Sequence, residues 1–277
     1  MADPVSITRN GHRTFFKWHR ARRRAADPVF TGGRILEGMR LGASVEVDLV
    51  IHGERGFAVL HDLDLGREST GSGAIAEKSA AELRALQLRD NEGNPIAEPV
   101  MLLEDLALLL SQGGLHPEAL LQLDFKEDQA ALDQQAIDNF GRSVGPVARH
   151  MILSSGEAAA VRLLTAAAPG IHVGYDPCHG DALQRLAESR DFSGFVSNAV
   201  AASPDAEMIY LEYELVLDAA EAGFDIVAAF HQASRRIDAY TIQRADAETL
   251  PKVERLLALK VDQITTDDPE GLAALVG

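Results

Sequence analysis

The repeated order of short β-rich runs and longer helical patterns most limits what this chain can fold into. This order begins near Phe15 and is typical of βα units around a parallel sheet. A (β/α)8 barrel needs eight strands, so we expect one candidate to be a hairpin partner or part of an insertion. The nine candidate strands are Phe15–His19, Ser44–Val50, Phe57–His61, Leu120–Phe125, His150–Ser154, Ile171–Tyr175, Met208–Tyr213, Ile237–Ile242 and Gln263–Thr266.

Length and composition agree with one large folded unit. The chain has 277 residues, of which 46% are hydrophobic and 25% are charged. These fractions are ordinary for globular proteins, and α/β barrels of about 250 residues commonly form one domain. Because no Pro/Gly/Ser-rich linker divides the sequence, we predict an α/β fold, a single TIM-type (β/α)8 barrel, with one domain over residues 1–277.

The charge balance limits the possible partners. A formal net charge of −16 argues against binding to nucleic acid or to an anionic membrane, because both would be repelled. An anionic substrate would need a local positive site, for which the run His19–Arg24 is a candidate. The single cysteine, Cys178, excludes an intramolecular disulfide, and no segment has the length and apolarity of a membrane span. We expect a cytoplasmic protein without stable membrane insertion.

The most informative segment is Glu46-Val47-Asp48, which lies within an apolar strand. Side chains alternate along a strand, so Glu46 and Asp48 project to the same side. Two like charges on one buried face repel each other unless a cation compensates them. A hard divalent cation such as Mg²⁺ or Ca²⁺ is therefore a natural ligand.

Other charged residues stand where further candidate strands end. His19-Arg20 follows one strand, His61-Asp62 closes another, and Asp124-Phe125-Lys126 closes a third. The C-terminal strand ends are where (β/α)8 barrels form their active sites. We therefore expect these side chains to meet the pair Glu46 and Asp48.

In these motifs the chain resembles the glycerophosphodiester phosphodiesterase family. That family has His-Arg-Gly after its first strand, Glu-x-Asp on its second, then His-Asp and Glu-x-Lys. The corresponding segments here are His19-Arg20-Ala21, Glu46-Val47-Asp48, His61-Asp62 and Asp124-Phe125-Lys126, and Tyr240-Thr241 stands where the family commonly has Trp-Thr. Ala21 replaces the family Gly, and Asp124 replaces the Glu that is the family's third metal ligand.

The resemblance implies a metal-dependent hydrolysis of glycerophosphodiesters to an alcohol and glycerol 3-phosphate. Glu46, Asp48 and Asp124 would bind Mg²⁺ or Ca²⁺, and Arg20, Lys126 and Tyr240 would contact the small-molecule phosphodiester. His19 and His61 would share the proton transfers, since histidine titrates near pH 7. One would activate the glycerol hydroxyl next to the ester, and the other would protonate the departing alcohol.

Several alternatives stay open at this point. His12 also precedes an arginine, but we favour His19 because a clear strand precedes it. The enzyme could instead be a phospholipase D-like protein that acts on lysophospholipids. A non-catalytic barrel that binds a phosphorylated metabolite is the alternative from another class, because fold alone does not establish chemistry.

Overall fold

The computed structural model describes residues 4–277, and within them eight parallel strands close into a barrel. Each strand pairs with the next along the chain, and β12 pairs with β2 to complete the circle. The predicted (β/α)8 barrel is therefore confirmed. Its strands are β2 (His12–Trp18), β3 (Ser44–Ile51), β7 (Leu120–Phe125), β8 (Met151–Ser154), β9 (His172–Tyr175), β10 (Met208–Glu212), β11 (Arg236–Ile242) and β12 (Gln263–Thr266).

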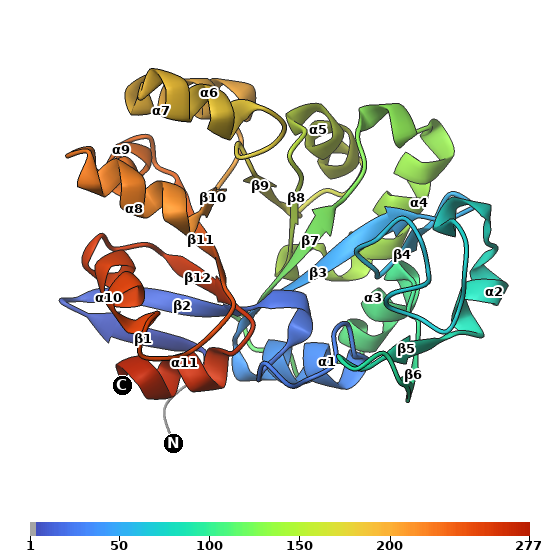
Figure 1. Ribbon diagram of the computed structural model, residues 1–277. Coiled ribbons are helices and arrows are strands. Elements are labelled where there is room, and N and C mark those ends of the chain that lie inside the picture. The colour runs from blue at the N-terminus through green and yellow to red at the C-terminus, as the bar shows by residue number, and fades with distance from the viewer. Residues whose placement is uncertain (1–3) are drawn as a thin grey trace.

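Helices surround the strands on the outside of the barrel (Figure 1). Aspartates begin several of them: Asp133, Asp225 and Asp268 each accept a backbone N–H of the first helical turn, which satisfies a donor that has no partner within the helix. The principal helices are α1 (Gly32–Leu41), α3 (Leu103–Ser111), α4 (Gln134–Val144), α5 (Ala158–Ala166), α6 (Ala182–Ser189), α7 (Phe192–Ala202), α8 (Tyr213–Glu221), α9 (Ile226–Gln232), α10 (Leu250–Ala258) and α11 (Pro269–Val276). None of the helices described in residues 4–277 has both the length and the apolarity to cross a bilayer.

Short elements are added to this barrel. The strand β4 (Phe57–Ala58) pairs antiparallel with β3, so the candidate strand Phe57–His61 is the expected hairpin partner. An unpredicted strand, β1 (Ser6–Arg9), pairs antiparallel with β2. The short helix α2 (Ala80–Arg84) precedes a second hairpin, β5 (Gln87–Arg89) and β6 (Pro95–Pro99).

Alternation along β3 separates the hydrophobic core from the polar interior of the barrel. Val45, Val47 and Leu49 are fully buried in a large apolar cluster with residues of α1, α3 and α4. Glu46 and Asp48 lie between them in sequence and project to the other side, as the pattern predicts, where they are 4% and 1% exposed. The fold therefore places two carboxylates inside the barrel.

Candidate active site

A cavity of about 300 Å³ lies among the residues that follow or end the barrel strands. Seven of the eight predicted site residues line it: His19, Arg20, Glu46, His61, Asp124, Lys126 and Tyr240. The eighth, Asp48, is buried and contacts two of them, Arg20 and Lys126. The structure thus brings together all the residues that the sequence analysis selects.

The three predicted metal ligands meet because of strand register. Asp48 of β3 is paired with Asp124 of β7, and Glu46 lies two residues before Asp48 on the same face. One ligand oxygen from each of these carboxylates can be chosen so that all three lie within 4.8 Å of one another. The carboxylate of Glu46 also accepts the backbone N–H of Arg20 at 2.6 Å.

Burial and neighbouring charges give the two acids of β3 opposite pKa shifts. Burial, reinforced by the nearby charge of Asp48, raises the pKa of Glu46 to about 7. Burial also opposes ionisation of Asp48, but Lys126 and Arg20 outweigh it and hold the pKa of Asp48 below its ordinary value. Asp48 is therefore ionised, whereas Glu46 needs further positive charge nearby to ionise fully at neutral pH.

Two cations already contact the acidic group. The ammonium of Lys126 lies 2.7 Å from Asp48 Oδ1 and 2.5 Å from Asp124 Oδ2. Arg20 Nε lies 3.2 Å from Asp48 Oδ2. Lys126 and Arg20 therefore compensate part of the negative charge for which the sequence predicts a metal alone. These ion pairs involve Asp48 and Asp124, and none of them involves Glu46.

The carboxylate group nevertheless fits a divalent cation. Oxygen ligands lie about 2.0–2.6 Å from Mg²⁺ or Ca²⁺, so oxygens on opposite sides of the ion are roughly 4–5 Å apart, as the spacing here allows. Asp48 Oδ2 is buried and lacks a hydrogen bond of normal geometry. A second acidic group, His61, Asp62 and Glu68, has similar spacing, but the guanidinium of Arg67 already contacts both of its carboxylates.

His19 is positioned by a residue from the far end of the chain. Its Nδ1 lies 2.6 Å from Asp267 Oδ1, just beyond β12. Because a carboxylate only accepts hydrogen bonds, Nδ1 carries the proton and the neutral ring keeps Nε2 as an acceptor. Arg22 also binds Asp267, at 2.8 Å. In the sequence, Asp267 lies outside the motifs that predict the site.

His61 reaches the cavity from a loop, which corrects one part of the sequence analysis. The strand that was expected to end at His61 stops at Ala58, because only two residues of this hairpin arm pair with β3. The loop is held by the buried Glu68, whose Oε2 accepts the backbone N–H of His61 at 2.8 Å. Asp62 Oδ1 lies 2.8 Å from His61 Nδ1, closer than Arg67 Nη2 at 3.3 Å, so Nδ1 of His61 donates to a carboxylate as Nδ1 of His19 does.

His12 lies at the opposite end of β2 from His19. It begins that strand, and its Nε2 is 3.1 Å from the carbonyl of Val261. The other arginines of the basic run are also taken up by acidic partners: Arg23 binds Glu37 and Glu270, and Arg24 binds Glu270. Arg20 is the arginine of this run that lines the cavity.

Tyr240 enters the same cavity from β11. Its hydroxyl donates a 2.9 Å hydrogen bond to Asp176 Oδ2. Burial raises the pKa of Asp176 to about 7, so this carboxyl is partly protonated near neutral pH. Asp176 follows β9 as an isolated acid in Tyr175-Asp176-Pro177, and no spacing in the sequence marks it.

Comparison with known proteins confirms the family that the sequence motifs indicate. The profile of the glycerophosphoryl diester phosphodiesterase family matches residues 37–271, most of the chain. The chain belongs to the glycerophosphoryl diester phosphodiesterase family. It is therefore a phosphoric diester hydrolase. A comparison with curated protein sequences finds no significant match.

Solved structures of two glycerophosphodiester phosphodiesterases and one further phosphodiesterase share the fold. The enzyme from Agrobacterium tumefaciens is 18% identical, with a TM-score of 0.65 over 94% of this chain and 99% of that one. The enzyme from Thermotoga maritima is 17% identical, with a TM-score of 0.65 over 95% and 99%. A phosphodiesterase from Oleispira antarctica, in complex with the product sn-glycerol-3-phosphate, is 20% identical, with a TM-score of 0.61 over 94% and 96%.

The departure from the family motif at Ala21 has a structural cost. Arg20 and Ala21 have φ values of 50° and 60°, in the left-handed region where Gly is favoured. An L-residue there costs roughly 1–2 kcal/mol. In this conformation the backbone N–H of Arg20 donates to Glu46 Oε2 at 2.6 Å. The carbonyl of Arg20 accepts the backbone N–H of Phe30 at 3.0 Å.

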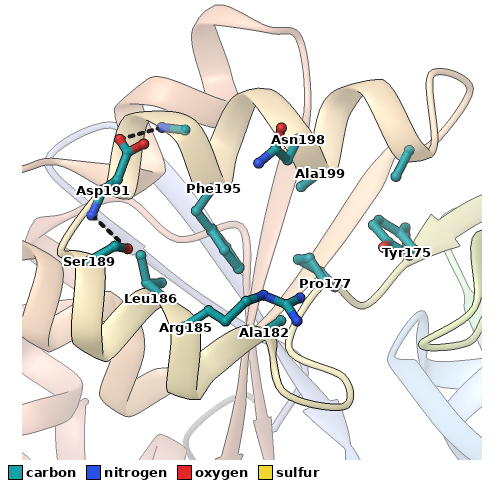
Figure 2. Close-up of a pocket in the computed structure, with 12 residues that line it drawn as sticks. Tyr175, Pro177, Ala182, Arg185, Leu186, Ser189, Asp191, Phe195, Asn198 and Ala199 are labelled. Carbon is teal, nitrogen blue, oxygen red and sulfur yellow. Dashed lines mark hydrogen bonds between the residues drawn. The ribbon is translucent and has the colours of Figure 1, made fainter.

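A separate cavity of about 440 Å³ lies between α6 and α7, and none of the predicted site residues line it (Figure 2). Phe195 and Leu186 contribute to its largely apolar wall, and Arg185 crosses part of it. Tyr175 and Pro177 line this cavity, whereas Asp176 between them lines the phosphodiesterase cavity. The segment Tyr175–Pro177 therefore contributes side chains to both cavities.

Proposed function

We propose that this phosphodiesterase hydrolyses glycerophosphodiesters to an alcohol and glycerol 3-phosphate, with Mg²⁺ or Ca²⁺ bound by Glu46, Asp48 and Asp124. The observation that carries the proposal is the meeting of these three carboxylates within 4.8 Å in the vicinity of the cavity that both histidines line. The sn-glycerol-3-phosphate held by the Oleispira antarctica phosphodiesterase supports this substrate class.

The charged residues prepare the cavity for a phosphodiester. When bound, the cation would neutralise phosphoryl charge and so make phosphorus a better electrophile. Arg20 offers a planar guanidinium fork, and Lys126 a compact ammonium, to the other phosphoryl oxygens. Both groups line the cavity and lie beside Asp48, which keeps them near the reacting centre.

His19 and His61 divide the proton transfers in this proposal. Their Nδ1 atoms are held by Asp267 and Asp62, so each ring keeps Nε2 for the substrate. One Nε2 takes the proton of the glycerol hydroxyl as its oxygen bonds to phosphorus. The other ring, protonated, gives its proton to the alcohol oxygen as the second phosphorus–oxygen bond breaks. Water then opens the cyclic phosphate with the roles reversed.

A lysophospholipid substrate is the second candidate. The α6–α7 cavity favours it, because a lipid chain needs an apolar space, and the segment Tyr175–Pro177 contributes side chains both to this cavity and to the catalytic one. A non-catalytic barrel has less support, since the described site keeps both histidines and all three acids. For location we propose the cytoplasm, in keeping with the single free thiol of Cys178.

An assay of products over a small panel distinguishes these functions. Glycerophosphocholine should yield choline and glycerol 3-phosphate. Lysophosphatidylcholine, the matched lipid, should react far more slowly. Faster release of choline from lysophosphatidylcholine would contradict the glycerophosphodiester assignment and support the lipid candidate. If the protein turns over neither compound, nor other glycerophosphodiesters in the panel, the proposed function is wrong.

A further inference from the structure

We infer that Ser154, oriented through Gln122 and Lys17, is a positioning residue that holds Asp124 in place to bind the cation. This inference rests on the proposed metal site. It concerns the ligand at which the chain departs from the family motif, where the shorter Asp stands in place of Glu. Lys17, Gln122 and Ser154 are 2%, 5% and 0% exposed, so their polar groups depend on one another rather than on water.

A continuous set of contacts crosses the barrel interior to reach Asp124. Ser154 Oγ donates to Asp124 Oδ1 at 2.6 Å, and Gln122 Nε2 donates to Ser154 Oγ at 2.8 Å. The ammonium of Lys17 donates to Gln122 Oε1. The same ammonium lies 2.9 Å from Asp238 Oδ2.

The chemistry of these groups fixes the direction of every hydrogen bond. An ammonium only donates, so Gln122 must turn its amide oxygen toward Lys17 and its NH₂ toward Ser154. Ser154 Oγ accepts from that NH₂, which leaves its own hydrogen to be donated to a carboxylate oxygen of Asp124. Lys17 therefore orients the amide of Gln122, and that amide orients the hydroxyl of Ser154 toward Asp124.

Strand register explains why these residues can act as a unit. Ser154 of β8 is paired directly with Asp124 of β7, and Gln122 lies two residues before Asp124 on the same face. With Ser154 on one carboxylate oxygen and Lys126 on the other, the side chain of Asp124 is held from two sides. Each oxygen keeps a lone pair for a cation. A short carboxylate depends on such support because it has little reach of its own.

Metal binding, measured directly, tests the inference. EDTA-treated, metal-free protein is titrated calorimetrically with MgCl₂ and with CaCl₂. Loss of a partner that orients a metal ligand typically weakens metal binding by roughly 10–100-fold, and Ser154→Ala should fall in this range. Gln122→Met should also weaken binding, although it leaves both Ser154 and Asp124 in place, because the hydroxyl is no longer oriented.

Ser44→Ala is the matched control. Ser44 is a buried serine that begins β3, two residues before Glu46, and its hydroxyl donates to Gln263 at 3.4 Å instead of to one of the three acids. Its removal should leave the affinity for Mg²⁺ and Ca²⁺ unchanged. A general loss of packing would affect both serine variants, whereas loss of positioning affects Ser154→Ala alone.

The outcomes separate this inference from the proposed function. If wild-type protein binds a cation and Ser154→Ala binds it equally well, Ser154 does not position Asp124, and the metal site stands without it. Should Ser154→Ala fail to fold, unchanged affinity in Gln122→Met would overturn the inference in the same way. If wild-type protein binds neither Mg²⁺ nor Ca²⁺, the proposed metal site is wrong, and the inference falls with it.

Discussion

At the scale of single residues, the active site combines side chains that sequence motifs predict with hydrogen-bond partners that no motif predicts. His19, Glu46 and Asp124 stand in recognisable motifs, so they could be selected before the fold was known. Asp267, which binds His19, is separated from it by 248 positions, and Ser154 looks like any serine in an apolar strand. Such partners are defined by barrel closure and strand register, which no local pattern encodes.

The first prediction concerns the choice between the two candidate histidines. Replacing His19 with Ala should lower kcat on glycerophosphocholine by roughly 10²–10⁴, the usual range for loss of a general acid or base. His12→Ala is the control and should retain most activity, because His12 contacts Val261 at the other end of β2. Steady-state kinetics of both variants decide the matter; the reverse order of activities would exclude His19 as the catalytic residue.

The second prediction concerns Asp124 itself. Asp124→Asn keeps the size of the side chain but removes its charge, so calorimetry should show weaker binding of Mg²⁺ or Ca²⁺. Asp124→Glu should lower activity as well, because the added methylene moves the carboxylate away from Ser154, and about 1 Å of misplacement can cost on the order of 10²-fold. Unchanged metal affinity in Asp124→Asn would show that Asp124 is not a ligand.

At the scale of elements, period and alternation predict most of the structure. Strands β3, β7 and β12 are found where alternating or apolar runs indicate them. Their ends are less certain, because a strand continues only as far as its neighbour provides partners. This is why the arm carrying His61 stops at Ala58, and why Ser6–Arg9, a short and largely polar run, pairs with β2 without a sequence signal.

The third prediction concerns how closely α1 packs on the barrel. A Cβ added at Gly38 would lie 2.7 Å from Val45 Cγ2 and 3.2 Å from the ring of Trp18, both of which are fully buried. Gly38→Ala should therefore lower the free energy of unfolding by roughly 1–3 kcal/mol, as overpacking does. Urea denaturation measures this change.

Gly33 provides the control for Gly38 within the same helix. A Cβ at Gly33 meets nothing within 4 Å, so Gly33→Ala should leave stability unchanged or raise it by up to about 1 kcal/mol through helix propensity. Equal effects of the two substitutions would contradict the close packing of α1 on β2 and β3.

At the scale of the whole molecule, the barrel follows from the sequence, whereas the balance of charge within it does not. The alternation of strands and helices leads directly to the closed parallel sheet. The ion pairs of Lys126 and Arg20 with Asp48 could not be foreseen, because they depend on side-chain positions at the ends of three different strands. Burial raises the pKa of Glu46 to about 7, so a cation bound beside this carboxylate would favour its ionised form.

The fourth prediction concerns folding stability. A ligand that binds only the folded protein stabilises it by about 2.7 kcal/mol when its concentration is 100 times its Kd. Addition of Mg²⁺ or Ca²⁺ to the EDTA-treated protein should therefore raise Tm. Asp48→Asn, which removes one of the two ligands of β3, should reduce this rise. A rise of equal size in both proteins would place the cation elsewhere.

The most direct test of the account is the rate at which EDTA-treated protein releases glycerol 3-phosphate from glycerophosphocholine before and after a divalent cation is returned. We expect almost no release in EDTA, and recovery with Mg²⁺ or Ca²⁺ in the wild-type protein but not in Glu46→Gln. Full activity in EDTA, or equal recovery in Glu46→Gln, would contradict a phosphodiesterase whose cation is bound by Glu46, Asp48 and Asp124.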